Sequence, residues 1–217
     1  MEKKLGNIYH SHNRSEMVPF LPAKFETVLE VGCGEAGFSK NLTNLRLLSY
    51  WGVEIDPLSA EAAKKLLSEV LVGDFDAVQE KIPKNYFDLV VCNDVIEHFC
   101  DHESFLQDIK NYMKPGACLV GSIPNVRHVS HLYELLVKKD WEYKPAGILD
   151  RTHMRFFTEV SWKRSLETAG FEILKLEGIN SLLMFESRKE KRIQKIMRSF
   201  LGRDTAFLQF GFCAKLK

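Results

Sequence analysis

Apolar and polar positions alternate along this chain in blocks that predict strands and helices in turn. Short apolar runs with few charges predict buried strands, and the stretches between the first five runs place apolar residues at helical spacing. Strands are expected at Thr27–Val31, Tyr50–Ile55, Val70–Val72, Phe87–Cys92 and Ala117–Ile123. Helices are expected near Gly37–Leu45, Pro57–Leu67, Phe75–Glu80 and Glu103–Met113.

This order predicts an α/β fold with a Rossmann-like, doubly wound and mostly parallel sheet. The run "FDLVVC" is apolar throughout, as expected of a strand buried on both faces. Ligands of such sheets bind at the carboxyl ends of the strands. Four segments are therefore expected around one site: Glu30–Gly37, Glu54–Asp56, Gly73–Phe75 and Asn93–His98.

The pattern changes after the fifth strand. Residues 126–157, rich in histidine, arginine and aromatic residues, precede a helix expected at Glu159–Ala169 and strands at Phe171–Gly178 and Leu208–Lys215. We expect a single domain over residues 1–217, with an N-terminal lid (1–26), an insert on the acceptor side (126–157) and a basic amphipathic helix (186–203).

Composition narrows the class of protein. Apolar residues make up 45% of the 217 residues and charged residues 27%, which is typical of a globular domain. The net charge of +1 gives no reason to expect a nucleic acid partner. The five cysteines form no C-x-x-C pair, and no apolar run reaches the length of a membrane span. We therefore expect reduced thiols and a cytoplasmic protein.

The stretch "VLEVGCGEAGFSK" runs a strand into a glycine-rich turn in which Gly32, Gly34 and Gly37 match G-x-G-x-x-G. Such a turn suits the pyrophosphate of NAD, but Glu30 would repel that group by ~1–4 kcal/mol per charge pair. The same carboxylate favours an ammonium group. S-adenosylmethionine (SAM) carries an ammonium, a sulfonium and no phosphate, so the turn favours SAM.

Two further acids fit this ligand. Glu54 ends the second strand about 20 residues past the turn, where a carboxylate can bind ribose hydroxyls. Asp74 follows the third strand within reach of the adenine amino group, and Phe75 and Ile55 are expected to pack against the ring.

The chain here resembles the class I SAM-dependent methyltransferases. Their motifs are matched in order by "VLEVGCGEAG", "GVEID", "GDF", "FDLVVCNDVIEHF" and "MKPGACLVGSIPN". The resemblance implies a seven-stranded sheet ending in an antiparallel hairpin, and methyl transfer that leaves S-adenosylhomocysteine. The cofactor residues expected from the motifs and the resemblance are Glu30, Gly32, Cys33, Gly34, Gly37, Glu54, Ile55, Asp56, Asp74, Phe75, Asn93, Tyr9 and Arg14.

A narrower resemblance concerns the acceptor. "SIPNVRHVSHLYELL" and "WEYKPAGILDRTHMRFFT" are similar to small bacterial methyltransferases of surface-polysaccharide and O-antigen biosynthesis, and "RTHMRFF" is similar to the ubiquinone-pathway O-methyltransferases. From these likenesses we expect the acceptor to be a hydroxyl of a small molecule or a glycan. Its proton needs a base, for which we expect His153 first and His128 second. His98 lies in a methyltransferase signature, and we expect no metal.

Two other functions stay open: an NAD-dependent dehydrogenase, and an inactive methyltransferase fold that only binds ligands. The segment Glu186–Arg203 places Ile193, Ile196, Met197, Phe200 and Leu201 on one helical face and lysine and arginine on the other. A basic amphipathic helix suits an anionic membrane surface. We expect either peripheral membrane contact or a helix packed on the sheet or a partner, and the oligomeric state stays open.

Overall fold

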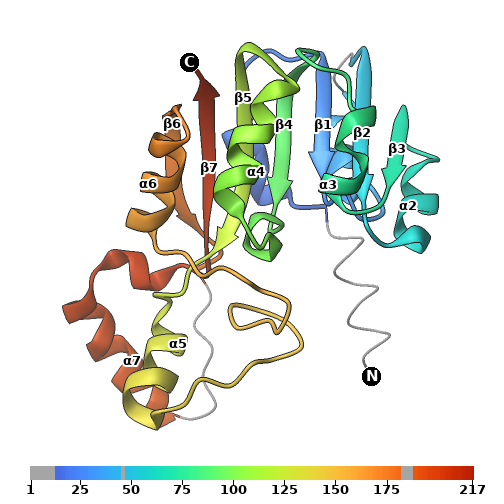
Figure 1. Cartoon of the computed structure of the whole chain (residues 1–217). Coiled ribbons are helices and arrows are strands. Elements are labelled where there is room, and N and C mark those ends of the chain that lie inside the picture. Colours follow the sequence, from blue (N-terminus) through green and yellow to red (C-terminus); the bar gives the residue numbers. More distant parts are fainter. Residues whose placement is uncertain (1–12, 45–46, 182–187) are drawn as a thin grey trace.

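A seven-stranded sheet forms the centre of the protein, with the strand order β3-β2-β1-β4-β5-β7-β6 (Figure 1). The computed structural model describes residues 13–44, 47–181 and 188–217. Strands β1 to β5 pair in parallel, and β7 lies antiparallel between β5 and β6. The strands are β1 Thr27–Val31, β2 Ser49–Glu54, β3 Glu69–Val72, β4 Phe87–Asn93, β5 Met113–Pro124, β6 Phe171–Ile179 and β7 Gln209–Leu216. The predicted Rossmann-like sheet with its final antiparallel hairpin is confirmed.

The helices are shorter than the sequence pattern predicts. The α-helices are α2 Pro57–Ala63, α3 Phe75–Val78, α4 His102–Asp108, α5 Val129–Tyr133, α6 Glu159–Thr168 and α7 Arg188–Leu201. The remaining helical turns are η1 Ser15–Phe20, η2 Gly37–Leu42, η3 Gln79–Lys81, η4 Ile96–His98, η5 Ile109–Asn111, η6 Glu134–Lys138 and η7 Arg203–Ala206. The helix predicted to Met113 was too long, because Met113 pairs with Phe87 and begins β5. Likewise, the segment from Gly37 forms a 3₁₀ helix.

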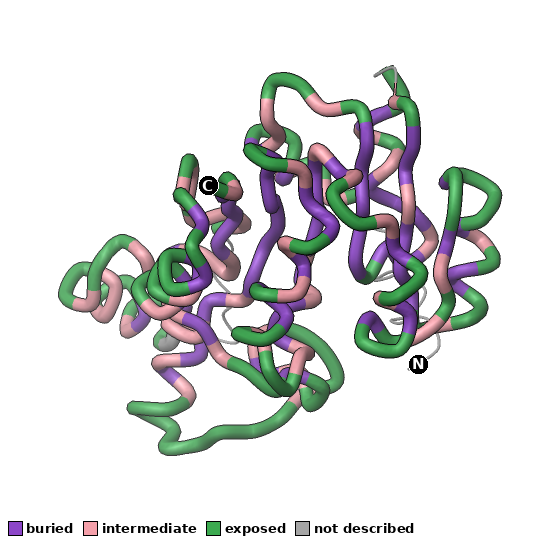
Figure 2. The backbone as a smooth tube through the Cα atoms, turned by 45° about the horizontal axis from the view of Figure 1, so that its top comes forward, coloured by how far each residue is buried: buried purple, intermediate pink, exposed green. Residues whose placement is uncertain are grey.

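Apolar side chains cover both faces of the sheet. Along β1 the side chains alternate between two core clusters, since Leu29 and Val31 join one and Val28 joins the other. The first cluster includes residues of α3, α4 and α6, and the second includes Met17 and Phe20 of η1. Figure 2 shows buried residues along the central strands. Polar groups that serve a ligand are therefore confined to the ends of the strands.

The carboxyl ends of β1 and β4 lie at the point where the connections change direction, since β1 pairs with β2 on one side and β4 on the other. Ligands of doubly wound sheets bind at such a point. Helices α5 and α7 and the segment between α5 and α6 lie beyond this end of the sheet (Figure 1). Residues 135–143 of that segment are all exposed, whereas Asn125 and Phe157 form a bridge at its base.

Gly121→Ala should destabilise the sheet strongly. A Cβ at Gly121 would meet the carbonyl oxygen of Cys92 in β4, and it would lie 2.8 Å from the Cys92 carbonyl carbon and 2.9 Å from the Phe212 ring. Because the obstacle is the backbone of a paired strand, we expect a loss of about 3 kcal/mol or more in the free energy of unfolding. Denaturant unfolding measures this loss.

Gly147→Ala is the control for that measurement. Gly147 has a φ of 93°, but a Cβ there has no heavy atom within 4 Å, so only backbone strain of about 1–2 kcal/mol is expected. Equal losses for the two variants would contradict the close approach of β4 and β5 at Gly121.

Candidate active site

The turn after β1 presents backbone N–H groups at the carboxyl end of the sheet. Gly32 and Gly34 have φ angles of 71° and 54°, in the left-handed region that favours glycine. A Cβ at Gly32 would also lie 2.8 Å from a methyl group of Val95. The N–H groups of Gly32 and Cys33 donate to the carbonyl oxygen of Val53, at 2.9 and 3.1 Å. Two hydrogen bonds therefore fix this tight turn to β2, and the glycine at its first position has no side chain.

Glu54 joins this turn to the start of α2. Its Oε2 accepts the N–H of Gly34 at 2.7 Å, and its Oε1 accepts the N–H of Asp56 at 2.9 Å. Each carboxylate oxygen can accept a second hydrogen bond, so Glu54 can hold the turn and still bind a ribose hydroxyl. The predicted position of Glu54 beside the glycine turn is confirmed, and its ribose contact stays a prediction.

The two residues after Glu54 have different roles: Ile55 is exposed, and Asp56 caps a helix. Asp56 caps α2, accepting hydrogen bonds from the Ser59 backbone N–H at 2.9 Å and hydroxyl at 2.7 Å. The predicted N-cap with Pro57 as the first helical residue is confirmed. Ile55 is 66% exposed at the end of β2, which leaves its apolar side chain available to an adenine ring.

Glu30 lies buried in β1 and has a partner that the sequence analysis missed. The Tyr50 hydroxyl donates to its Oε2 at 2.6 Å. Burial raises the pKa of Glu30 to about 8, although the hydrogen bond from Tyr50 lowers it. The signal for this pair was available in the parallel register, because Val28 pairs with Tyr50 and places both side chains on the face of Glu30.

Burial governs the thiol of Cys33 as well. This thiol is 4% exposed, and burial raises its pKa above the ordinary value. Gly37, the last glycine of the motif, is buried at the start of η2. The turn therefore holds no reactive nucleophile, and these two residues shape it through packing.

Asn93 ends β4 with a buried side-chain amide. Both the nitrogen and the oxygen of the Asn93 side-chain amide are buried, and neither has a hydrogen-bond partner within the part of the chain that the structure describes. A buried amide without partners costs free energy, so such a group usually marks a ligand or water position. This agrees with the prediction that Asn93 lies beside the cofactor.

Asp94, which the sequence analysis did not select, follows at a φ of 50°. Its carboxylate accepts a hydrogen bond from Ser122 at 2.6 Å and binds the side chains of Arg14 and Gln209. Arg14 is thus brought to the carboxyl end of β4, as expected of a cofactor contact, but its guanidinium binds Asp94. Tyr9 lies outside the described residues.

Asp74 and Phe75 follow β3, as predicted. The exposed side chain of Asp74 accepts the N–H of Asp76 at 3.0 Å and caps α3. The Phe75 ring is only 3% exposed, and it packs against Phe99, Phe105 and Tyr112. The structure therefore places Phe75 in the core, so Ile55 is the better placed residue for the adenine ring.

The insert returns to the sheet at Glu97. The carbonyl oxygen of Glu97 accepts the N–H groups of Met154 and Arg155, at 2.8 and 3.0 Å. This contact brings His153 to the end of β4, where its Nε2 lies 3.8 Å from Oε1 of Glu97 and its ring packs edge-on against His98. Burial lowers the pKa of His98, and His153 adds to this effect.

The second candidate base, His128, has a different position. It is fully buried and serves as the N-cap of α5, where its Nδ1 lies 2.7 Å from the Ser130 hydroxyl oxygen. The structure therefore brings together Asn93, Asp94, Glu97, His98 and His153, and leaves His128 in a capping role. Glu97 was also missed, although it stands beside His98 in the motif "VIEHF".

Comparisons with known proteins agree with this geometry. Residues 9–176 match a family model described as a methyltransferase domain. The chain is 30% identical over 103 residues to a probable tocopherol O-methyltransferase of Oryza sativa subsp. japonica, covering 45% of the chain and 28% of that protein. It is 28% identical over 117 residues to a ubiquinone biosynthesis O-methyltransferase of Nitrosomonas europaea, covering 51% of the chain and 49% of that protein. These alignments span half of each relative or less.

Solved structures show the same fold over nearly the whole chain. A SAM-dependent methyltransferase from Archaeoglobus fulgidus superposes with a TM-score of 0.66 at 18% identity, covering 99% of this chain and 94% of that one. A possible histamine N-methyltransferase from Thermotoga maritima gives a TM-score of 0.64 at 18% identity, again covering 99% and 94%. Because one family model spans most of the chain and the sheet has this strand order, the chain belongs to the class I SAM-dependent methyltransferases.

Proposed function

We propose that the protein binds SAM at the carboxyl ends of β1, β2 and β4 and transfers its methyl group to a hydroxyl of a small molecule or glycan. The observation that carries the proposal is the unpartnered Asn93 amide beside the turn that Glu54 holds, because a buried amide and a free carboxylate lone pair both need a polar ligand. An inactive binding fold is disfavoured, because the polar groups for SAM are all present.

The residues present fit SAM group by group. In this proposal Glu30 binds the ammonium, Glu54 accepts hydrogen bonds from the ribose hydroxyls, and the exposed apolar side chain of Ile55 packs against adenine. When bound, SAM supplies an electrophilic methyl on a sulfonium: the C–S bond breaks as the acceptor C–O bond forms, S-adenosylhomocysteine leaves, and the hydroxyl proton is released. Holding the acceptor in line accounts for up to ~7–11 kcal/mol of the barrier.

The acceptor is expected beneath the insert, between it and the carboxyl ends of the strands. A carbonyl oxygen can only accept, so the Ile148 carbonyl, 3.0 Å from Nδ1 of His153, leaves the Nε2 lone pair of that histidine free to act on the hydroxyl. His153 remains our first candidate for the residue that promotes proton loss. His128 is second, because its capping role limits its access.

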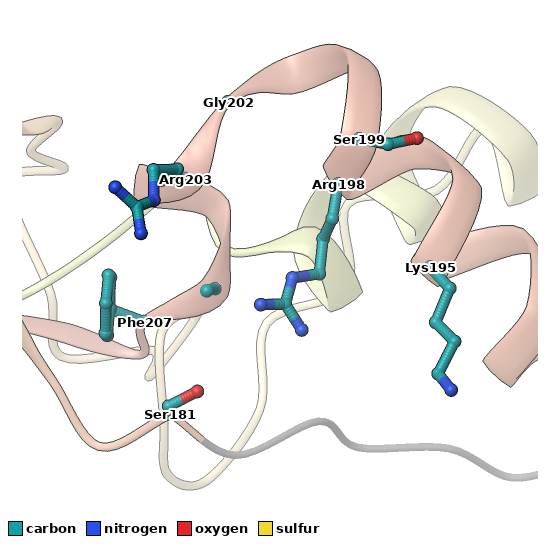
Figure 3. A pocket seen from close by; sticks show the side chains of 8 residues that line it. Ser181, Lys195, Arg198, Ser199, Gly202, Arg203 and Phe207 are labelled. Atoms are coloured by element: carbon teal, nitrogen blue, oxygen red, sulfur yellow. The ribbon is translucent and has the colours of Figure 1, made fainter.

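A basic pocket beside α7 supports an anionic acceptor. Lys195, Arg198 and Arg203 line a pocket of about 390 Å³, and no acidic side chain is among its described lining residues. Figure 3 shows Arg198 extending from α7 towards Ser181, and Lys195 extending from the same helix. This charge suits the phosphate of a lipid-linked glycan, an acceptor that would also fit a basic helix at a membrane surface.

Glu54→Gln should weaken SAM binding by about 10- to 150-fold, and Glu54→Ala by at least as much. The loss corresponds to ~1.5–3 kcal/mol, the worth of hydrogen bonds to a charged group. Isothermal calorimetry measures SAM affinity, with circular dichroism as a check on folding. Glu69→Gln changes an exposed acid at the opposite end of the sheet and should leave the affinity unchanged. A folded wild-type protein without SAM affinity would overturn the proposal.

SAM binding at pH 7 should release a proton from Glu30. A carboxyl group with a pKa of about 8 is mostly protonated at pH 7, and an ammonium beside it stabilises the carboxylate and lowers that pKa. Calorimetry in buffers of different ionisation enthalpy should show up to about one proton more released by the wild type than by Glu30→Gln. Protonation of the SAM amine is common to both proteins, so equal release would exclude a direct contact between Glu30 and the ammonium.

The outer face of α7 leads to a third test. Ile196 and Phe200, one turn apart, are 50% and 84% exposed, close to the basic pocket. No helix among the described residues is long and apolar enough to cross a membrane, so any membrane contact of these residues is at the surface. We therefore expect this face to bind anionic bilayers through burial of apolar side chains and attraction of the basic ones.

Phe200→Ser should reduce co-sedimentation with vesicles of anionic phospholipid by about fivefold or more, because one large apolar contact is lost. The wild type and both variants should bind only weakly to vesicles of neutral phospholipid. Leu58→Ser is the matched control, since Leu58 is 83% exposed on α2, away from the basic pocket. Equal binding to anionic and neutral vesicles would exclude this role of α7.

A further inference from the structure

Three side chains with metal-binding atoms meet where the insert returns to the sheet. One carboxylate oxygen of Glu97 and one ring nitrogen each of His98 and His153 lie within 4.8 Å of one another. Glu97 and His98 belong to η4 after β4, and His153 comes from the insert. Residues more than 50 positions apart are thus brought to one point, beside the predicted cofactor residues.

Among the described residues, none forms a hydrogen bond with the carboxyl group of Glu97. Both of its oxygens are buried, and neither has a partner within the described part of the chain. The separation of 3.8 Å from Nε2 of His153 is too long for a hydrogen bond. A buried carboxyl group in this state costs free energy. A bound cation would remove that cost, whereas a purely structural role leaves it unexplained.

The two histidines are oriented as metal ligands are. Nδ1 of His98 lies 3.2 Å from the Thr152 carbonyl oxygen, and Nδ1 of His153 lies 3.0 Å from the Ile148 carbonyl oxygen. Because a carbonyl only accepts, Nδ1 carries a proton in each ring, and in the neutral ring Nε2 then keeps its lone pair. Metal-binding histidines commonly have their second nitrogen held by a carbonyl in this way.

Backbone hydrogen bonds hold the cluster in place. The hydrogen bonds from Met154 and Arg155 to the Glu97 carbonyl oxygen hold its two parts together. The ligand atoms are therefore positioned by the fold before any ion binds.

We propose that Glu97, His98 and His153 bind a divalent transition-metal ion such as Zn²⁺. Two imidazole nitrogens and one carboxylate are a typical ligand set for such an ion, and they leave at least one position open. Bonds of about 2.1 Å in a tetrahedron separate ligand atoms by ~3.4 Å, so modest side-chain rotation closes the cluster. The proposal departs from the sequence expectation that no metal is bound.

The open position suits the acceptor hydroxyl. An ion held there would lower the pKa of an acceptor hydroxyl bound at the open position, and the proton would be released to solvent when the oxygen receives the methyl group. His153 then acts by holding the ion, in place of taking the proton itself. This role rests on the proposed function, but the binding of the metal does not.

Metal binding can be measured without SAM or acceptor. The full chain, freed of metal by a chelator, should bind one Zn²⁺ in calorimetry, and Co²⁺ should give the visible absorption of a site with nitrogen ligands. Mg²⁺, which prefers oxygen ligands, should bind at least 100-fold more weakly. No Zn²⁺ binding, or equal affinity for Mg²⁺, would overturn the proposal.

Variants locate the site. Glu97→Gln and His153→Ala should each weaken Zn²⁺ binding by at least tenfold, whereas SAM affinity should stay within a few-fold and report correct folding. His102→Ala is the matched control, since His102 is partly buried against Ser165 but lies outside the cluster. If both cluster variants bind Zn²⁺ as the wild type does, the ion lies elsewhere and the proposal is wrong.

Turnover measurements distinguish two roles of His153: holding a metal ion, or taking the acceptor proton itself. Adding Zn²⁺ to the metal-free wild type should restore activity, and His153→Ala should lose about 10²-fold in kcat with or without Zn²⁺. Full activity of the metal-free wild type would show that His153 acts without an ion. If SAM affinity fails but Zn²⁺ binding holds, only the proposed methyl transfer is lost.

Discussion

The carboxylate of Glu54 holds the centre of this site together. It accepts one N–H from the glycine turn after β1 and another from the segment that begins α2. Without these two hydrogen bonds, the N–H groups of a tight turn at a buried sheet edge would need other partners. The positions of Gly34, Ile55 and Asp56 all follow from this contact. The residue that we propose binds the ribose therefore also helps to determine the shape of the site.

The end of β4 shows the opposite arrangement, in which polar groups are buried and left unsatisfied. Asn93 and Glu97 have buried polar atoms without partners in the described chain, and between them Asp94 is fully engaged. Packed interiors rarely leave such groups unpaired without a functional reason. The contrast separates a residue that builds the structure from two residues that we propose bind a ligand.

The insert and α7 lie beyond the carboxyl ends of the strands. The sheet is shared with relatives at under 20% identity, so it reports the fold and says little about the acceptor. We propose that the basic pocket beside α7 and the histidine cluster bear on the acceptor. Residues of α7 line the pocket and the insert supplies His153, so both features include segments outside the shared sheet.

The sequence alone determined the sheet, the glycine turn and the acids at the strand ends, because these depend on local patterns. Apolar runs define strands, and a strand end places its next polar residue at the sheet edge; Glu30, Glu54 and Asn93 were found in this way. Helix ends were less predictable, since pairing of Met113 with Phe87 ended a helical pattern early. Only the tertiary structure decided that Phe75 faces the core, that Arg14 binds Asp94, and that His153 meets Glu97 and His98. These contacts join residues far apart in the chain, and no local pattern records which of them the packing will bring together.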